Sequence, residues 1–164
     1  MPTAAVILAA GASRRLGRPK QLLPYRGRPL LRAVATEVCA SRCDGVAVVV
    51  RGGDPDVDAC LDGLPVRLLA NPGCAEGIAS SIRVGVAWAD REAYDGVVLL
   101  LSDQPALTAH HVDVLAGACG AEVAVVASRY GGELGVPALF VRALFPALLA
   151  LRGECGAKAL IGRA

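Results

Sequence analysis

The chain has 164 residues, of which 54% are hydrophobic and 20% are charged, and its formal net charge is +2. This length favours a single domain over residues 1–164, and the composition excludes a disordered chain. The near balance of charge argues against a nucleic-acid partner. No apolar run approaches the roughly 18 residues that span a bilayer, and the N-terminal segment lacks the basic region of a signal peptide. We therefore expect a soluble, cytoplasmic protein with no membrane partner.

Apolar runs of strand length alternate along the chain with segments of helical periodicity. In chain order the pattern predicts a strand at 4–9, a helix at 29–40, a strand at 45–50, a helix at 54–61, a strand at 66–70, a helix at 78–91, a strand at 96–101, a helix that Thr108 caps and that runs to about 118, strands at 123–127 and 136–141, and helices at 143–151 and 157–161. Pro137 predicts an edge or a bulge where the last strand begins. Such alternation predicts an α/β fold, in which a mostly parallel sheet is covered on both faces.

Residues suited to chemistry follow several of the predicted strands. Gly11 follows the first strand, Asn71 the third and Asp103 the strand at 96–101. Ligands of open α/β sheets bind outside the carboxyl ends of the strands. We therefore expect the functional site at that edge of the sheet.

The segment at residues 8–20, LAAGASRRLGRPK, is rich in glycine and basic residues. Its spacing matches neither GxGxxG nor the Walker A loop. Gly11 nevertheless permits a sharp turn, and the amides after it can surround an anion. Arg15 and Lys20 would neutralise phosphate charge. The segment is therefore interpreted as a phosphate-binding loop, although a solvated basic loop has a similar composition.

Two acidic residues are candidates for a metal site. Asp103 follows an uncharged apolar strand, and a carboxylate there, opposite a phosphate loop, suits Mg²⁺. The same residue could instead form an Asx turn before Pro105. Glu154, taken by itself, is an exposed acid in a loop.

The cysteines and histidines do not form a recognisable metal motif. The chain has 6 cysteines and no CxxC pair. We interpret the cysteines as free thiols of a reducing compartment. His110 and His111 are adjacent, and neighbouring helical positions point about 100° apart, so the pair cannot chelate one ion well. They are assigned a structural or surface role.

Five motifs occur in a fixed order over nearly the whole chain. They are LAAGASRRLGRPKQLLP at 8–24, Asn71-Pro72 with EGIASSI at 76–82, LSDQP at 101–105, GELGVP at 132–137 and GECGAK at 153–158. This set resembles the signature of the MobA-like nucleotidyltransferases. The Ala-Ala-Gly opening and the Pro19-Lys20 pair are most similar to the branch of molybdenum cofactor cytidylyltransferases.

The resemblance implies a Rossmann-like three-layer αβα sandwich and Mg²⁺-dependent transfer of CMP from CTP to the phosphate of molybdenum-loaded pterin. The implied catalytic residues are Arg15, Lys20 and Asp103. The implied nucleotide-binding residues are Leu8, Ala9, Ala10, Gly11, Ala12, Ser13, Lys20, Asn71, Gly77, Ser80, Ser81 and Asp103. The implied metal ligands are Asp103 and Glu154, and the implied acceptor-binding residues are Gln104, Gly135 and Pro137. Ser80 and Ser81 could equally be ordinary serines at a helix start.

The sequence departs from the family pattern at a few positions. Leu16 stands where Met is common, and Glu154 stands where the family has Asp. Family members usually continue for a few tens of residues beyond the last motif, so the domain is interpreted as shortened at its C-terminus. The alternatives are use of GTP, a sugar-phosphate acceptor, or a non-catalytic or redox-recruited relative. The implied product would pass to a molybdoenzyme or its chaperone.

Overall fold

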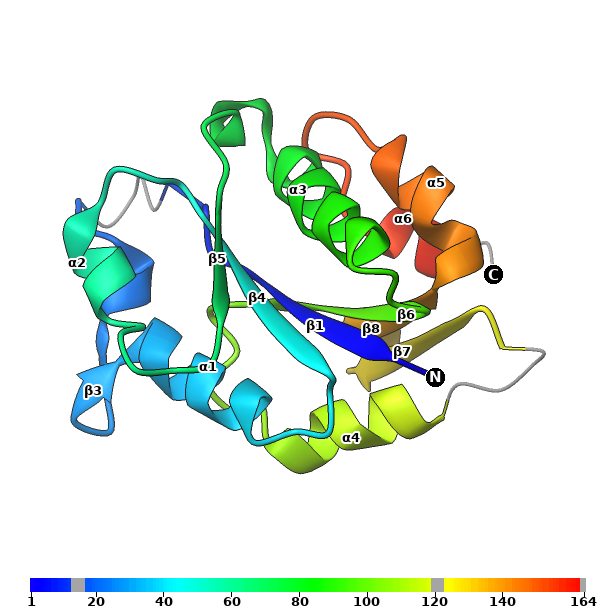
Figure 1. Ribbon diagram of the computed structural model, residues 1–164, viewed down its shortest axis with the longest axis horizontal. Coiled ribbons are helices and arrows are strands. Elements are labelled where there is room, and N and C mark those ends of the chain that lie inside the picture. Colours follow the sequence, from blue (N-terminus) through cyan, green and yellow to red (C-terminus); the bar gives the residue numbers. More distant parts are fainter. Residues whose placement is uncertain (13–16, 119–122, 163–164) are drawn as a thin grey trace.

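A six-stranded sheet forms the centre of the molecule (Figure 1). In spatial order its strands are β5 (Arg67–Ala70), β4 (Gly45–Val50), β1 (Thr3–Leu8), β6 (Gly96–Leu101), β8 (Glu133–Val141) and β7 (Val125–Tyr130). Strand β8 runs antiparallel to its two neighbours, and the other strands run parallel to one another. The structure is a computed structural model and describes residues 1–12, 17–118 and 123–162. The prediction of a mostly parallel sheet is confirmed.

Helices cover both faces of this sheet (Figure 1). One layer contains α3 (Ile78–Arg91), α5 (Phe145–Leu149) and α6 (Lys158–Ile161), and the other contains α1 (Leu30–Cys39), α2 (Pro55–Ala59) and α4 (Ala109–Gly117). Within the described residues, no helix is long and apolar enough to cross a bilayer. The arrangement confirms the predicted three-layer αβα sandwich.

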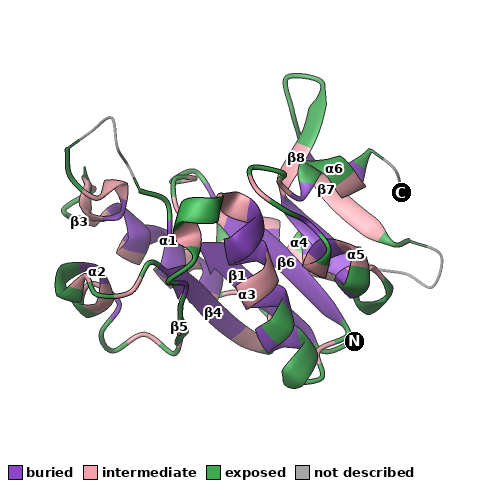
Figure 2. Ribbon diagram, turned by 90° about the horizontal axis from the view of Figure 1, so that it is seen from above, coloured by how far each residue is buried: buried purple, intermediate pink, exposed green. Residues whose placement is uncertain are grey.

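The two faces of the sheet bury separate apolar clusters. Along β1, Val6 belongs to the cluster beneath α3, and Ile7 belongs to the cluster beneath α1. Both side chains are fully buried, and the central strands are buried along most of their length (Figure 2). A strand with helices on both faces has no solvated side, which explains why its sequence is continuously apolar.

A small hairpin precedes α1 and was not predicted. It pairs β2 (Pro24–Tyr25) with β3 (Arg28–Pro29) through a turn in which Arg26 has a φ of 49° and Gly27 a φ of 79°. Positive φ at both central positions is the geometry of a type I′ hairpin turn. The prediction that α1 includes Pro29 is wrong, because Pro29 is extended, with a ψ of 140°, and α1 begins at the next residue.

The hairpin of β7 and β8 is longer than predicted. Strand β7 continues to Tyr130 and β8 begins at Glu133, because the polar end of this hairpin lacks the apolar run that defines a buried strand. The register shifts between Ala127 and Ser128, which leaves Val136 and Pro137 as extra residues on β8. The bulge predicted from Pro137 is therefore confirmed.

Helix α3 lies unusually close to the sheet. A Cβ placed on Gly85 would come within 2.4 Å of Val6 Cγ1, so only glycine permits this approach. Through this contact, Gly85 sets the spacing between α3 and β1. The N-terminal end of α3 reaches the carboxyl edge of the sheet, where the functional residues gather.

The described residues also form three 3₁₀ turns, two of which lie at the carboxyl edge of the sheet. The turn η1 (Lys20–Leu22) follows the loop after β1, and η2 (Cys74–Glu76) joins β5 to α3. A third turn, η3 (Arg142–Leu144), leads from β8 into α5. The first two turns bring residues of separate motifs to the same edge.

Candidate functional site

A cavity of about 480 Å³ opens at the carboxyl edge of the sheet. Its walls come from the ends of β1 and β6, from the residue after β4, from η1 and η2, from the start of α3 and from the loop before α6. The lining residues are Leu8, Ala10, Gly11, Ala12, Lys20, Gln21, Arg51, Cys74, Ala75, Gly77, Ile78, Ser81, Leu101, Ser102, Asp103 and Glu154. The cavity therefore lies where the strand pattern predicted the site.

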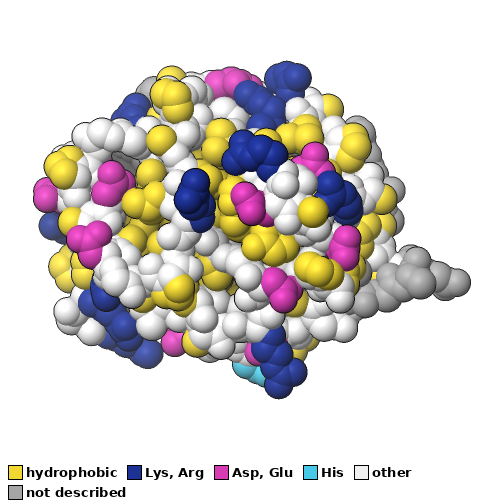
Figure 3. All heavy atoms as spheres, viewed as in Figure 1, with side chains coloured by type: hydrophobic (Ala, Val, Ile, Leu, Met, Phe, Trp, Pro, Cys, Tyr) yellow, Lys and Arg dark blue, Asp and Glu magenta, His cyan; other side chains and the backbone are white. Residues whose placement is uncertain are grey.

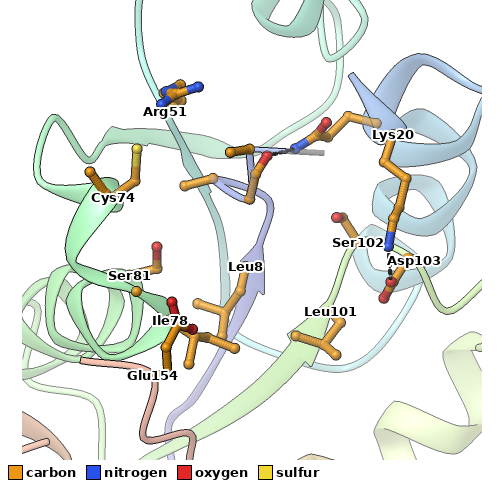
Figure 4. A pocket seen from close by; sticks show the side chains of 16 residues that line it. Leu8, Lys20, Arg51, Cys74, Ile78, Ser81, Leu101, Ser102, Asp103 and Glu154 are labelled. Carbon is orange, nitrogen blue, oxygen red and sulfur yellow. Dashed lines mark hydrogen bonds and ion pairs between the residues drawn. The ribbon is translucent and has the colours of Figure 1, made fainter. Parts of the chain in front are cut away.

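One wall of the cavity carries an ion pair. Lys20 Nζ lies 2.9 Å from Asp103 Oδ2, although the two residues are 83 positions apart in the sequence (Figure 4). Asp103 lies two residues beyond β6, and Lys20 opens η1 after the basic loop. The side chains keep exposed fractions of 45% and 39%. The structure thus brings together the cation and the carboxylate that were predicted to be catalytic.

The turn after β1 is braced by Gln21, which was not predicted as a site residue. Gln21 is buried, and its Nε2 donates to Ala9 O at 2.5 Å and to Gly11 O at 3.3 Å. These contacts fix the backbone that leads from the buried strand into the cavity. In the sequence, the feature that could have identified Gln21 as a site residue is its position directly after Lys20.

The opposite wall combines the start of α3 with the loop before α6. Figure 4 shows Ile78, Ser81 and Glu154 on the side of the cavity that faces Lys20 and Asp103. Glu154 lies on that loop, and no regular element holds it. The two carboxylates predicted to bind metal therefore line the same cavity from different walls.

Gly77 permits the close contact between these two segments. Its φ of 124° is disfavoured for any residue with a side chain, and a Cβ there would lie 2.4 Å from Gly153 O. The predicted site residue Gly77 thus has a conformational reason for its identity. The loop that carries Glu154 packs directly against the start of α3 because no side chain intervenes.

Asn71 braces the cavity and is not among its lining residues. Its Nδ2 donates to Ser80 Oγ and to Ser81 Oγ, both at 2.9 Å, and its Oδ1 accepts from Gly73 N at 3.1 Å. The side chain is only 3% exposed. Ser81 lines the cavity, whereas Ser80 donates to Gly77 O at 2.8 Å. Direct nucleotide contact by Asn71 and Ser80 stays a prediction, and their observed partners are within the protein.

The residues predicted to bind the acceptor lie together beside the cavity. Gln104 Oε1 accepts from Leu101 N at 3.1 Å, and its Nε2 donates to Val136 O at 2.9 Å, between Gly135 and Pro137. Gln104 thus fastens the end of β6 to the bulge of β8. These residues do not line the cavity, and their acceptor role stays a prediction.

His111 has the structural role that was predicted. Its Nε2 lies 2.9 Å from Ser128 Oγ, and Ser128 Oγ donates to Pro137 O at 2.7 Å. The histidine thereby connects α4 to the bulge between β7 and β8.

Arg51 also lines the cavity and was missed by the sequence analysis. It directly follows β4, so the same strand rule that selected Gly11 and Asp103 would have found it. Arg51 also lines a second hollow of about 240 Å³, to which the predicted residue Ala9 contributes. Ser13 and Arg15, which were predicted as site residues, lie outside the described residues.

The ionisable groups outside this cavity are dispersed. Basic and acidic side chains are interspersed on the face shown in Figure 3, with no continuous basic field there. Residues 1–12, 17–118 and 123–162 contain no group of three or more His, Cys, Asp or Glu side chains that could hold a metal ion. The cysteines among them are free thiols, and burial raises the pKa of Cys39, Cys43 and Cys60. The cavity, with the Lys20–Asp103 ion pair on one wall and Glu154 on the other, is therefore the main chemical site among the described residues.

In open α/β sheets, nucleotides bind outside the carboxyl ends of the parallel strands, and this cavity lies at that edge, with Lys20 and Asp103 on its wall. The family model described as the MobA-like NTP transferase domain matches residues 5–164. The chain belongs to this family of nucleotidyltransferases, as its motifs indicated.

Curated relatives carry several different names. The purine catabolism protein PucB of Bacillus subtilis (strain 168) is 32% identical over 95% of this chain and 78% of its own length. The molybdenum cofactor guanylyltransferase of Rhodobacter capsulatus is 35% identical over 92% of this chain and 75% of its own. The nicotine blue oxidoreductase of Paenarthrobacter nicotinovorans is 38% identical over 63% of this chain and 50% of its own.

Solved structures share the fold over nearly the whole chain. The crystal structure of Rv0371c from Mycobacterium tuberculosis H37Rv, in complex with manganese, aligns with a TM-score of 0.79 and 30% sequence identity. The alignment covers 99% of this chain and 83% of that chain. The Rossmann-like fold implied by the motifs is thereby confirmed.

Proposed function

We propose that this protein transfers CMP from CTP to the phosphate of molybdenum-loaded pterin and releases pyrophosphate, in a reaction that depends on Mg²⁺. The observation that carries the proposal is the Lys20–Asp103 pair on the wall of the cavity, at 2.9 Å. The cation on η1 suits a triphosphate, and the carboxylate just beyond the parallel strand β6 suits its metal ion. The product would pass to a molybdoenzyme or its chaperone.

The choice of substrate is supported by motifs and by one relative. The relative from Rhodobacter capsulatus is named a molybdenum cofactor guanylyltransferase, which supports the same acceptor. CTP is supported by the Ala9-Ala10-Gly11 turn and the Pro19-Lys20 pair, which resemble the cytidylyl branch. The turn lines the cavity at Ala10 and Gly11, where a ligand would meet backbone rather than bulky side chains.

The residues of the cavity fit a magnesium ion. Asp103 and Glu154 would hold the ion with carboxylate oxygens from facing walls, because Mg²⁺ characteristically takes one or two carboxylates together with phosphate oxygens and water. The manganese complex of the relative Rv0371c also supports a divalent ion in this fold. When bound, the ion would neutralise charge on the phosphate oxygens.

The protein's own contribution to the chemistry is positioning and charge neutralisation. In the proposed reaction, an acceptor phosphate oxygen forms a bond to the α-phosphorus, and the bond from that phosphorus to the bridging oxygen of pyrophosphate breaks. Lys20 would exchange its contact with Asp103 for the triphosphate and stabilise the departing pyrophosphate. The exposed pair contributes little to stability, so the exchange has a small energetic cost.

Pyrophosphate release tests this proposal. Release would be measured with Mg²⁺ from CTP and from GTP, with and without molybdenum cofactor, for the wild type and for Lys20→Ala. We expect release only with CTP and acceptor together, and near loss of release in the variant. Arg42→Ala is a suitable control, since that side chain is 90% exposed and lies outside the cavity. Normal release by Lys20→Ala would overturn the role of Lys20.

Two alternatives give different results in the same assay. Release from GTP but not from CTP, in the presence of the acceptor, would favour guanylyl transfer, which the name of the Rhodobacter relative supports. No release from either nucleotide, while CTP still binds tightly in a separate titration, would favour a non-catalytic or redox-recruited relative, a class that the name of the nicotine blue oxidoreductase supports.

A further inference from the structure

Glu76 and Arg83 form a two-point ion pair next to the loop that carries Glu154. Arg83 NH1 donates to Glu76 Oε1 at 2.9 Å, and Arg83 NH2 donates to Glu76 Oε2 at 2.5 Å. Glu76 ends η2, and Arg83 lies in the second turn of α3. Neither residue lines the cavity, and neither has a role in the proposed reaction.

The same two side chains hold the loop before α6. Glu76 Oε1 accepts from Gly153 N at 3.1 Å, across 77 positions of sequence, and Arg83 NH1 donates to Leu151 O at 2.7 Å. The start of α3 adds a reciprocal bond, in which Ala79 N donates to Gly153 O at 3.1 Å. The backbone on the N-terminal side of Glu154 is therefore fixed by groups of η2 and α3.

This attachment places Glu154. A Cβ on Gly77 would lie 2.6 Å from Gly153 C and 2.9 Å from Glu154 Cδ, so the loop and the carboxylate both pack against the α3 start. A shift of Gly153 would consequently move Glu154 along the cavity wall. Because no helix or strand contains Glu154, these contacts are its principal support among the described residues.

We propose that Glu76 and Arg83 act as a positioning clamp that holds Glu154 on the cavity wall and so raises the affinity of the site for a metal–nucleotide complex. The inference rests on the proposed function, in which Glu154 contributes to the metal site. Groups that orient metal ligands without touching the metal commonly change affinity by about 10–100-fold when replaced.

The chemistry of Glu76 fits a clamp rather than a metal ligand. Both of its oxygens accept hydrogen bonds within the protein. The hydrogen bonds from Arg83, followed by the Gly153 amide, lower the pKa of Glu76 to about 2. The carboxylate thus stays ionised at neutral pH, and its oxygens accept from Arg83 on α3 and from Gly153 of the loop.

Amide hydrogen exchange tests the clamp without any ligand. Exchange at Gly153 N and Ala79 N would be followed by NMR in the full-length wild type, Glu76→Gln and Arg83→Lys. We expect exchange at least about 10-fold faster at Gly153 in both variants, because a lysine cannot reproduce the two-point contact. Glu133→Gln is the matched control, since it removes an exposed ion pair with Lys158 at 2.6 Å outside the cavity. Unchanged exchange at Gly153 in the clamp variants would overturn the proposal.

Mn²⁺ binding in the presence of CTP tests the link to Glu154. Electron paramagnetic resonance titration would give dissociation constants for the wild type, Glu76→Gln, Glu154→Gln and the double variant. We expect each single variant to weaken binding about 10-fold, and the double variant to bind no more weakly than Glu154→Gln alone. Additive losses would show that Glu76 does not act through Glu154, which overturns the positioning role.

The two measurements separate this inference from the proposed function. If Glu154→Gln binds Mn²⁺ and CTP as the wild type does, the metal role of Glu154 fails, and with it the effect of the clamp on affinity. The exchange result at Gly153 decides independently whether the clamp holds the loop.

Discussion

The two carboxylates that face the cavity are held in different ways. Asp103 lies two residues beyond β6, a buried strand that pairs with both β1 and β8. Glu154 lies on a loop between α5 and α6 that is fixed by side chains and by the close contact at Gly77. The sheet therefore places one carboxylate, and a set of tertiary contacts places the other.

This difference teaches where the site is rigid and where it depends on a few contacts. Displacing Asp103 would disturb the end of β6, and both β6 and its neighbour β1 are almost fully buried. Displacing Glu154 requires only the loss of hydrogen bonds on partly exposed side chains. We expect substitutions on the Asp103 wall to affect chemistry directly, and substitutions on the Glu154 wall to act through geometry.

The largest effect is expected for Asp103→Asn. The change keeps the shape of the side chain but removes the charge that pairs with Lys20 and that is proposed to bind Mg²⁺. Loss of one preorganised electrostatic group typically lowers the rate by about 10²–10³-fold. The measurement is the steady-state rate of pyrophosphate release with saturating CTP. A loss smaller than about threefold would remove Asp103 from the proposed mechanism.

Gly77→Ala should disrupt the other wall and destabilise the fold. The variant must adopt a φ of 124° and meets Gly153 O at 2.4 Å. Backbone strain of this type costs about 1–3 kcal/mol, and about 2–4 °C of melting temperature is lost per kcal/mol in a chain of this size. Thermal unfolding followed by circular dichroism measures the change. Gly63→Ala is the matched control, because Gly63 has a φ of 80° but nothing within 4 Å of the added carbon. Equal losses in the two variants would show that the contact with Gly153 is unimportant.

Glu154→Gln should reduce activity less than Asp103→Asn does. Its carboxylate stands on a loop and has one more methylene than aspartate, so its oxygens are less narrowly positioned. We expect about a 10-fold higher Mg²⁺ concentration for half-maximal pyrophosphate release, with little change in the rate at saturating Mg²⁺. If Glu154→Gln loses as much of the rate of pyrophosphate release as Asp103→Asn does at every Mg²⁺ concentration, the two carboxylates contribute equally. The proposed difference between the Asp103 wall and the Glu154 wall is then wrong.

The smallest effect is a dependence of stability on pH. The folded-state pKa of Glu76 is lowered from 4.5 to about 2 by Arg83 and the Gly153 amide. A lowered folded pKa contributes stability that is present above about pH 4.5 and is lost as the pH falls toward 2. The wild type should therefore melt above Glu76→Gln at pH 6, and the difference should shrink by pH 3. Melting curves at both pH values test this, and a constant difference would contradict the assigned cause.

The part of the site that the sheet determines could be predicted from the sequence. The run GVVLLL at β6 predicts a buried strand, and the edge rule then places Asp103 beside the loop after β1. Lys20 was predicted with it, and the structure pairs the two. Arg51 was within reach of the same reasoning, since it follows the apolar run of β4.

The rest of the site depends on contacts that leave no local pattern. Gly153 and Glu76 are separated by 77 positions, and nothing in the periodicity of either segment indicates that they meet. The hairpin of β2 and β3 was missed for a related reason, because its strands are too short to show alternation. Asn71 was predicted as a ligand contact from its motif and from its place after the third strand, whereas its observed partners are Ser80, Ser81 and Gly73.

The absence of a side chain at Gly85 has a consequence for how this scaffold can change its substrates. Gly85 lets α3 lie against Val6, and Gly77 and Ser81, at the start of that helix, form one wall of the cavity. We expect a methyl group at position 85 to push α3 away from β1, because the added carbon would lie 2.4 Å from Val6 Cγ1. The start of α3, which forms one wall of the cavity, would then move away from the sheet. A substitution at this one buried position would therefore change the width of the cavity, while every residue that lines the cavity stays the same.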